Sequence, residues 1–513
     1  MKTIFKSVFI ITVFSLIIKV LGFFMRVVLS RSLGAEGLGM FSVALSIFAV
    51  FSCLVSSGIP VIISHKSAKF KITGETKKEG AYVSSGLIIS LICCCIVSAG
   101  IFLFKNIIIR LTNNTSYFVM LALLPGLFAT AIYSCFRGAL WGRKKHFENS
   151  LGEFFEQLVR LVLYLLMLSS STDIATGATR AGFAISVSYI VSMLIAIIYY
   201  YKDGGKLNKP KSEFKSLLKS SIPITVIRIF SSLIMSLVSI ILPMRLLAAG
   251  ISEEIALSLY GIAVGMTIPL LSFPNTLIGS YSTALVPELS SLRAQNKQNE
   301  FNEQIKIAIK ITLFITFCFV PLFIGLGQAI GVFLFDNLES GVLLVKSAWI
   351  MIPSSISGIT ASVLNVMNLE TKSFINYIIG FTVLILSVWF LPSVIGIEAF
   401  VFGIGACMSI VSVLNILIIY KKTQVKNLIF KPLVLMTIFT IPASIISSEL
   451  LGVLKYIVTP FLSLFISGSI GIIFFVLLCI IFDVVDLISI LKDFKGIKIF
   501  KFKNKKGIKQ QKI

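Results

Sequence analysis

Long apolar runs recur along the whole chain and are separated by short polar segments. A helix needs about 20 apolar residues to cross the hydrocarbon core of a bilayer. The pattern therefore predicts an all-α integral membrane protein with about fourteen transmembrane helices. The predicted spans are, approximately, 8–29, 38–63, 81–104, 117–140, 151–169, 181–201, 220–244, 256–282, 307–330, 343–365, 373–391, 398–419, 432–449 and 457–482.

Basic residues are distributed unevenly between the polar segments that join these spans. The segments on the side of the N-terminus hold 33 Lys and Arg, and the alternate segments hold seven. By the positive-inside rule, this imbalance predicts a multi-pass protein of the cell membrane with both termini in the cytoplasm. The Lys-rich C-terminal stretch 486–513 is expected to lie against anionic membrane lipids, which are therefore predicted partners.

The composition supports the membrane assignment and argues against a soluble protein, a nucleic-acid-binding protein and a disulfide-rich protein. Of 513 residues, 57% are hydrophobic and 13% charged, whereas soluble domains are about 45–50% apolar and about 25% charged. A net charge of +24 would suggest nucleic-acid binding if it lay on the surface of a soluble protein. Here the basic residues follow the positive-inside distribution, so no nucleic-acid partner is expected. All eight cysteines fall inside spans, so we expect no disulfide framework, no metal site and no cofactor.

The polar connections are too short for a soluble catalytic domain, since none exceeds about twenty residues. The chain contains no phosphate-binding glycine loop, no HExxH sequence and no nucleophile elbow. We therefore predict that the protein is not an enzyme, has no catalytic residues and does not hydrolyse ATP. Many glycines and prolines within apolar helices are typical of transporters that bend.

Two parts of the chain resemble each other, which indicates an internal repeat. Arg31 and Arg245 occupy matching outer ends of the first and seventh spans, 214 residues apart, and Pro125 and Pro353 are 228 apart. Six spans per repeat is an even number, so both copies share one orientation. We predict an N-terminal lobe at 1–205, a C-terminal lobe at 206–425, two appended helices at 426–485 and the tail 486–513.

Six basic residues are not counted with the connecting segments and lie within predicted spans, where an ionisable group is costly unless it faces a cavity or a partner. Lys19 and Arg26 are seven residues apart and therefore share one face of a helix. Arg228 lies about two turns into the seventh span, the repeat partner of the first. We predict that these three bind substrate in a central cavity, and that an anionic, phosphate-bearing cargo suits them. The other three are Arg137, Arg160 and Lys310.

Charged residues near the cytoplasmic side of spans four and five form a second candidate group. Glu156 and Arg160 have the favourable i, i+4 spacing on one helical face. The spacing predicts an internal ion pair, and a gate contact or a proton site remains an alternative. The residues expected to shape the cytoplasmic access path or gate are Arg137, Arg143, Glu153, Glu156 and Arg160.

Two prolines interrupt the eighth predicted span. Pro269 and Pro274 should break the helix and free backbone carbonyls beside Asn275. A hinge and a fixed kink are equally compatible with this pattern.

Several stretches in both halves resemble the polysaccharide-flippase branch of the multidrug/oligosaccharidyl-lipid/polysaccharide exporter superfamily, most closely its stage V sporulation protein B type. The resemblance implies two lobes that alternate between inward- and outward-open forms. In relatives of the lipid II flippase type it implies cavity arginines in the first span, where this chain has Lys19 and Arg26. The matching stretches are IIKVLGFFMRVVLSRSLGAEGLGMF, SGIPVIISHKSAK, FRGALWGRKKHFENSLGEFFEQLVR, ILPMRLLAAG and LYGIAVGMTIPLLSFPNTLIGSYSTALVPELS.

The resemblance also implies a function. The expected activity is translocation of an undecaprenyl-pyrophosphate-linked saccharide, a peptidoglycan precursor or polysaccharide unit that could serve the spore cortex, from the inner to the outer leaflet. The expected partners are this lipid-linked oligosaccharide and cell-wall synthesis enzymes. The alternatives are a cation-coupled multidrug antiporter on the same fold, a membrane-embedded polysaccharide polymerase or ligase, and a scaffold for sporulation machinery.

Overall fold

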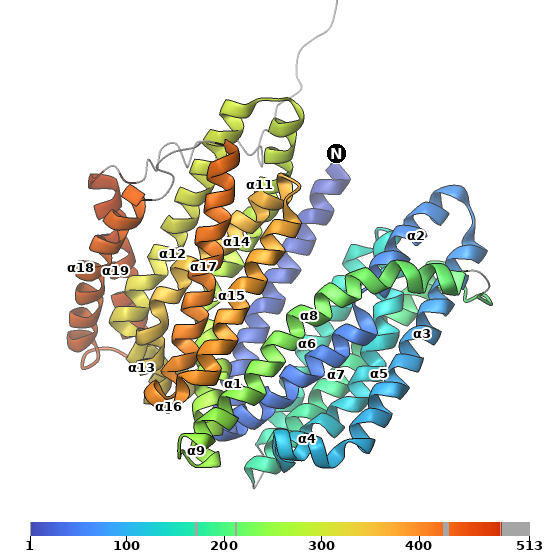
Figure 1. Ribbon diagram of the computed structural model, residues 1–513, viewed down its shortest axis with the longest axis horizontal. Coiled ribbons are helices and arrows are strands. Elements are labelled where there is room, and N and C mark those ends of the chain that lie inside the picture. The colour runs from blue at the N-terminus through green and yellow to red at the C-terminus, as the bar shows by residue number, and fades with distance from the viewer. Residues whose placement is uncertain (1, 170–172, 211–212, 424–429, 483, 485–513) are drawn as a thin grey trace, which may run out of the picture. The chain divides into compact units, whose positions relative to one another are not determined.

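A computed structural model of the chain consists of helices joined by short turns, and no strand occurs among the residues it describes (Figure 1). These residues are 2–169, 173–210, 213–423, 430–482 and 484. The Lys-rich stretch 486–513 lies outside them, so its predicted contact with lipid stays a prediction. The all-α prediction is confirmed.

The N-terminal part of the chain forms seven α-helices. A kink at Gly34, where φ is 66°, lies inside α1, and glycine adopts such a positive φ at little steric cost. The predicted spans 8–29 and 38–63 are therefore joined through a bend inside α1 instead of a loop. The helices are α1 (Lys2–Ser56), α2 (Ile59–Thr73), α3 (Thr76–Leu103), α4 (Lys105–Leu111), α5 (Asn114–Gly142), α6 (His146–Leu168) and α7 (Ile174–Lys202).

The remaining helices include an interrupted segment at the eighth predicted span. There the chain passes from α9 through a π-helix, η1, to α10 and α11. The elements are α8 (Glu213–Ala248), α9 (Glu253–Tyr260), η1 (Gly261–Thr267), α10 (Ile268–Leu271), α11 (Phe273–Ala294), α12 (Gln298–Phe335), α13 (Leu338–Ser347), the 3₁₀-helix η2 (Ala348–Ile350), α14 (Met351–Val366), α15 (Glu370–Phe390), α16 (Pro392–Ile395), α17 (Glu398–Thr423), α18 (Phe430–Leu454) and α19 (Pro460–Ile481).

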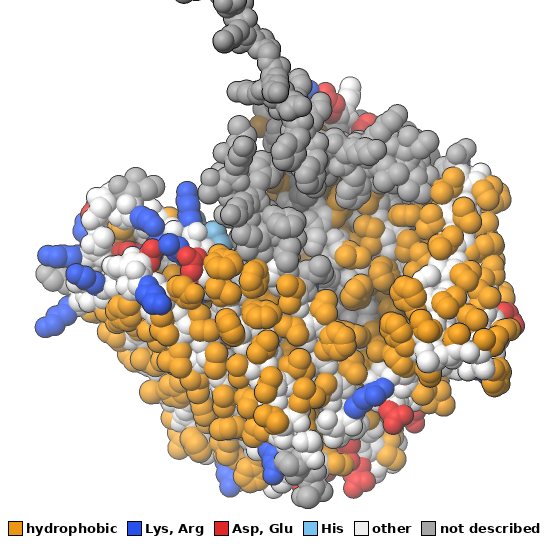
Figure 2. Space-filling model, turned by 180° about the vertical axis from the view of Figure 1, so that it is seen from behind, with side chains coloured by type: hydrophobic (Ala, Val, Ile, Leu, Met, Phe, Trp, Pro, Cys, Tyr) orange, Lys and Arg blue, Asp and Glu red, His pale blue; other side chains and the backbone are white. Residues whose placement is uncertain are grey.

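Twelve helical segments of the described residues are long and apolar enough to cross a membrane. One of them, Ile17–Lys71, covers both of the first two predicted spans, and α6 is not among the twelve. The count of fourteen therefore stays a prediction, whereas the multi-pass membrane character is clear. Hydrophobic side chains cover much of the described surface in Figure 2, as contact with lipid requires.

The chain divides into two compact units, each of which is described separately. The first comprises Met1–Phe273, Gly327–Ser354 and Thr371–Leu414, and the second comprises Pro274–Leu326, Ser355–Glu370 and Asn415–Ile513. The predicted lobe boundaries 1–205, 206–425 and 426–485 are not tested by this division and stay predictions.

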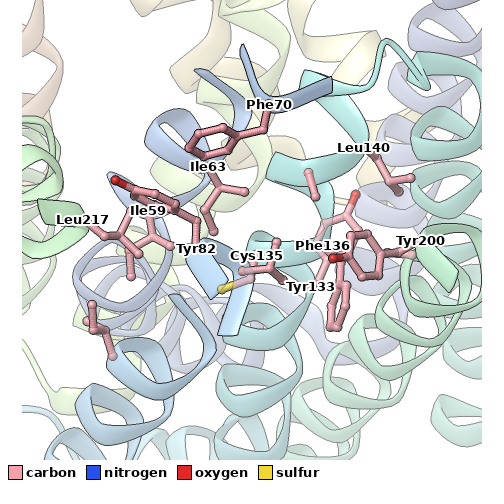
Figure 3. Close-up of a cluster of buried hydrophobic side chains, with 14 residues drawn as sticks. Ile59, Ile63, Phe70, Tyr82, Tyr133, Cys135, Phe136, Leu140, Tyr200 and Leu217 are labelled. Atoms are coloured by element: carbon pink, nitrogen blue, oxygen red, sulfur yellow. The ribbon is translucent and has the colours of Figure 1, made fainter. Parts of the chain in front are cut away.

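The core of the first unit is built around α5, which packs against α1, α2, α3 and α7. Figure 3 shows a buried cluster contributed by α2, α3, α5, α7 and α8, in which Ile63, Cys135, Tyr200 and Leu217 are inaccessible to solvent. Because lipid tails are as apolar as these side chains, close packing, more than the hydrophobic effect, stabilises such a cluster in a membrane. The cluster fixes α5 and α7, which contact the candidate site described below.

In the second unit, α18 packs directly against α19. The seam contains small residues on both helices, and a Cβ on Gly471 of α19 would lie 1.9 Å from the Ser447 hydroxyl of α18. Small residues allow membrane helices to approach closely and gain van der Waals contact. The outward faces of both helices expose Ile and Phe side chains, as lipid contact requires.

Candidate functional site

The candidate site is a polar network inside the first unit, and α6 supplies most of it. Asn149, Glu153, Glu156 and Arg160 recur every three or four residues along α6, so they share one face. This helix packs against α1 and α7, which places the polar face against protein instead of lipid. Charged groups in a membrane helix are tolerated under that condition.

The deeper part of the network contains the predicted Glu156–Arg160 ion pair, with an N–O distance of 2.6 Å. Arg160 also donates from Nε to the Ser188 hydroxyl of α7 at 3.0 Å, and its guanidinium lies 5.0 Å from the centre of the Tyr189 ring. The Glu156 residue is 7% exposed. The prediction of an internal ion pair is confirmed, and the additional partners on α7 satisfy the buried charges.

A second part of the network lies one turn towards the start of α6 and includes Arg137 of α5. Tyr133 donates from its hydroxyl to Oδ1 of Asn149 at 3.2 Å and to Oε1 of Glu153 at 3.5 Å. Asn149 donates in turn to Glu153 at 3.0 Å. The Arg137 guanidinium lies 5.2 Å from the Tyr133 ring centre and 4.8 Å from that of Trp141. These are cation–π distances.

Arg137 keeps an unused donor in this arrangement. Its Nε is buried and has no hydrogen-bond partner among the described residues, although the rings beside it hold the guanidinium plane. Buried donors are usually paired, so an unpaired one calls for an explanation. The position is compatible with the predicted role in the access path, which stays a prediction.

The three predicted substrate-binding cations lie on two helices of the first unit. Lys19 and Arg26 are on α1, Arg228 is on α8, and all three are exposed. No hydrogen bond or ion pair involves any of them within the described part of the chain. Tyr164 of α6 lies within electrostatic range of both Arg26 and Arg160, so Arg26 borders the α6 network. The structure shows no such link for Lys19 or Arg228.

Arg143, the remaining predicted access residue, lies in a different cluster at the C-terminal end of α5. It is 7% exposed and donates from Nε and from one terminal nitrogen to the two carboxylate oxygens of Glu79, both at 2.8 Å. Its other terminal nitrogen donates to the Asp203 carbonyl at 2.9 Å and to the Asp203 carboxylate at 3.3 Å. The guanidinium group is thus fully engaged, and it binds Glu79 in the bidentate geometry that makes arginine–carboxylate pairs strong.

This cluster joins the ends of four helices, because Glu79 is on α3, Asp203 follows α7 and Lys145 precedes α6. Lys145 pairs with Asp203 at 3.1 Å and with Glu148 at 3.4 Å. Burial acts to raise the pKa of Asp203, but the hydrogen bond and charge of Lys145 outweigh it and the pKa is lowered. The hydrogen bond to Asp203 raises the pKa of Lys145. We infer that Arg143 clamps these helix ends together.

Arg31 and Arg245, the predicted repeat pair, each bind the C-terminal end of another helix. Arg31 donates from Nε to the Leu334 carbonyl of α12 at 2.9 Å and also bonds the preceding carbonyl. Arg245 donates from Nε to the Trp389 carbonyl of α15 at 2.7 Å, and its guanidinium carbon lies 5.3 Å from the centre of the Trp389 ring. The last carbonyls of a helix lack partners within the helix, and cations are favourable there.

The proline segment is interrupted as the sequence indicates. The helical path breaks at Ser272, between α10 and α11, and the π-helix η1 precedes Pro269; such π-helical turns often occur at functional sites. The chain also passes from the first unit to the second at Pro274. Asn275 accepts a hydrogen bond from the Ser355 hydroxyl at 3.1 Å. A hinge role for these residues stays a prediction.

The polar network also contains residues that the sequence did not single out. Tyr133, Tyr164 and Tyr189 are ordinary members of apolar spans, and only their distance from a charged residue in the fold marks them. The partners of Arg143 are 64 and 60 residues away, so no local spacing reveals them. Ser188 bonds Arg160, and Ser192 bonds Glu156. These serines are one turn apart on α7, a spacing that indicates a polar helix face.

Comparisons with known proteins agree with this architecture. The family described as "Polysaccharide biosynthesis protein" matches residues 4–293. The stage V sporulation protein B of Bacillus subtilis (strain 168) is 24% identical over 394 residues, which cover 74% of this chain and 76% of that protein.

Solved structures show the same fold. The lipid II flippase MurJ in an inward closed conformation has a TM-score of 0.64 at 18% identity, covering 92% of this chain and 98% of that chain. An inward-facing multidrug resistance MATE family transporter of the MOP superfamily has a TM-score of 0.66 at 14% identity, covering 79% and 94%. At these identities the likeness concerns the fold alone.

Proposed function

The chain belongs to the polysaccharide biosynthesis protein family, and we propose that it is a flippase for an undecaprenyl-pyrophosphate-linked saccharide. The cargo would be a peptidoglycan precursor or a polysaccharide unit, moved from the inner to the outer leaflet by alternating access without ATP hydrolysis. Both termini would be cytoplasmic, which the excess of basic residues on that side supports. The similarity to a sporulation protein and the fold shared with a lipid II flippase support the same class of cargo.

The observation that carries the proposal is the sign of the unpaired charge in the membrane-spanning helices of the first unit. Lys19, Arg26 and Arg228 have no carboxylate partner among the described residues. Glu156 is paired with Arg160, and Glu153 accepts from a neighbouring amide. A positive charge left unpaired in a membrane helix is costly unless a ligand or cavity meets it. A pyrophosphate offers the matching oxygens.

A cation-coupled drug antiporter is the second candidate, because a MATE transporter shares the fold and fold does not determine function. An organic cation needs an unpaired carboxylate in the membrane. The α6 carboxylates are already engaged, so the charge pattern favours the anionic cargo.

Complementation of a cell depleted of its lipid II flippase tests the proposal. Lys19→Gln and Arg228→Gln should each abolish growth rescue, whereas Lys19→Arg should retain it because the charge is kept. The matched control is Lys310→Gln, which removes a basic residue from another predicted span that we do not assign to the site. Membrane abundance of every variant is measured alongside.

Two results would reject the flippase. One is full rescue by the Lys19→Gln/Arg228→Gln double variant at normal abundance. The other is robust efflux of organic cations that Lys19→Gln leaves unchanged, which would establish the antiporter instead.

A further inference from the structure

A pocket of about 190 Å³ lies in the first unit at the N-terminal end of α5, the opposite end of that helix from Arg143. We call it the α4–α9 pocket. Residues from α4 to the start of α5 form one side, α8 and α9 form the other, and Val43 of α1 also lines it. In the proposed orientation it opens on the extracellular side of the membrane.

Three residues that line the pocket, Arg110, Asn113 and Glu253, keep hydrogen-bonding groups that no described residue uses. Asn113 accepts from the Ser116 backbone N–H at 2.6 Å, which caps α5 and fixes the amide group. Its Nδ2 is buried and finds no hydrogen-bond partner among the described residues. Arg110 and Glu253 also line the pocket, and neither forms a hydrogen bond or ion pair with any residue that the structure describes. The pocket therefore offers two kinds of donor and a charged acceptor.

An apolar wall faces these groups. Ile240, Pro243, Met244 and Leu247 line the pocket from α8 at the spacing of one helical face. Small-molecule sites combine such a wall with a few placed polar groups. A sugar ring matches this pattern, because its hydroxyls both donate and accept while its C–H face is apolar.

Charge argues against a phosphate in the same place. Glu253 lines the pocket, and Glu36, Glu254 and Asp173 interact electrostatically at this end of the unit. Arg110 and Glu253 both line the pocket, so an anion would meet a carboxylate as well as the guanidinium, whereas a neutral hydroxylated ring would meet no charge repulsion. The volume is below the roughly 300–1,000 Å³ of drug-sized ligand sites, which suits one ring better than two.

We propose that the α4–α9 pocket binds a single sugar residue of the cargo, held by the free Asn113 amide, Arg110 and the Glu253 carboxylate. This inference rests on the proposed transport of a lipid-linked saccharide and adds a sugar-recognition site to it. The pocket gives the headgroup a place at the release side that is chemically distinct from the cationic residues of α1 and α8.

Saturation-transfer NMR on the full-length protein in lipid nanodiscs, free of glycoside detergent, tests the proposal with N-acetylglucosamine and methyl glucoside at millimolar concentration. Asn113→Asp keeps the oxygen that caps α5 but removes the amide donor, so the fold is preserved. Glu253→Gln removes the charged acceptor. The matched control is Glu254→Gln, which changes the next residue in the same turn of α9 but does not line the pocket.

Saturation transfer to at least one sugar is expected in the unmodified protein. It should fall about fivefold or more in Asn113→Asp, which loses the amide donor, and in Glu253→Gln, which replaces a charged acceptor with a weaker neutral one. It should stay unchanged in Glu254→Gln. Three results would overturn the site: no transfer in the unmodified protein, in which case the amide binds only water; equal transfer in all variants; or displacement of the sugar by inorganic phosphate.

The binding test is separable from the proposed function. Lys19→Gln should leave sugar binding intact while it abolishes growth rescue. Loss of the sugar signal with normal rescue rejects the pocket alone, and sugar binding without any rescue by the unmodified protein rejects the flippase alone.

Discussion

Replacing Glu79 by glutamine should destabilise the first unit more than any substitution at an exposed ion pair. Glu79 and Arg143 are 3% and 7% exposed, and the carboxylate binds two guanidinium nitrogens at 2.8 Å each. Removing one partner of such a buried pair costs about 3–5 kcal/mol. Arg143 would keep its contacts with Asp203, so we expect a loss near the lower limit, about 3 kcal/mol.

The measurement is equilibrium unfolding of the purified protein in mixed micelles. The matched control is Glu303→Gln, which breaks the Lys306–Glu303 pair, where the side chains are 41% and 63% exposed. Exposed pairs contribute about 0–1 kcal/mol, so this variant should unfold almost as the unmodified protein does. Equal losses in Glu79→Gln and Glu303→Gln would refute the clamp.

A double variant separates the lost pair from the lost packing. Glu79→Leu together with Arg143→Met replaces the pair by apolar side chains, which is often nearly neutral for buried pairs. The double variant should therefore be more stable than either single variant. Strict additivity of the two single losses would show that the residues are not coupled, and the reasoning from their geometry would be wrong.

Two further predictions concern packing and pH. Gly39→Ala should lower the free energy of unfolding by about 1–3 kcal/mol, since a Cβ there would lie 2.0 Å from the Leu257 carbonyl oxygen. The control Gly100→Ala, where a Cβ would have nothing within 4 Å, should be neutral or slightly stabilising. Equal shifts of the melting temperature in the two variants would contradict the packing argument. Acid should weaken the clamp through Asp203. Burial acts to raise the pKa of this carboxyl, but the hydrogen bond and charge of Lys145 outweigh burial, so its pKa is lowered. The stability that Asp203 contributes is therefore present above the ordinary carboxyl pKa of about 3.9 and is lost as pH falls through the pKa of the folded state. When unfolding midpoints are measured from about pH 6 to pH 2, Asp203→Asn should reduce the loss of stability at the acid end.

The helices were largely predictable because membrane spans are a local property of the sequence. An apolar run of the right length must form its backbone hydrogen bonds within itself in lipid, so α3, α5 and α7 follow the predicted spans closely. The backbone departs from this pattern at Gly34, where φ of 66° and ψ of −176° are not helical, so α1 consists of two helical stretches that meet at a kink. It departs again where η1 replaces regular α-helix in the interrupted segment.

The site was predictable only where its contacts are local. Glu156 and Arg160 are four residues apart, so helix geometry alone brings them together. The Glu79–Arg143 pair depends on α3 and α5 lying side by side, which tertiary packing decides. In the sequence, Arg143 is one of several charged residues near the cytoplasmic side of spans four and five, which predicts a place in the access path. Its partners become visible only in the folded first unit.

The two residues of the predicted repeat pair bind the same kind of acceptor in different parts of the chain. Arg31 and Arg245 both donate to carbonyls at the end of a helix, as expected for cations near helix C-termini. The acceptor of Arg245 lies within the same predicted lobe, 206–425. The acceptor of Arg31 belongs to the other predicted lobe, because Leu334 is in α12. If the lobes separate at this end during transport, the Arg31 bond must break while the Arg245 bond can persist. In the proposed alternating-access cycle, the Arg31 bonds would therefore contribute to the energy difference between the two forms, whereas the Arg245 bond would not.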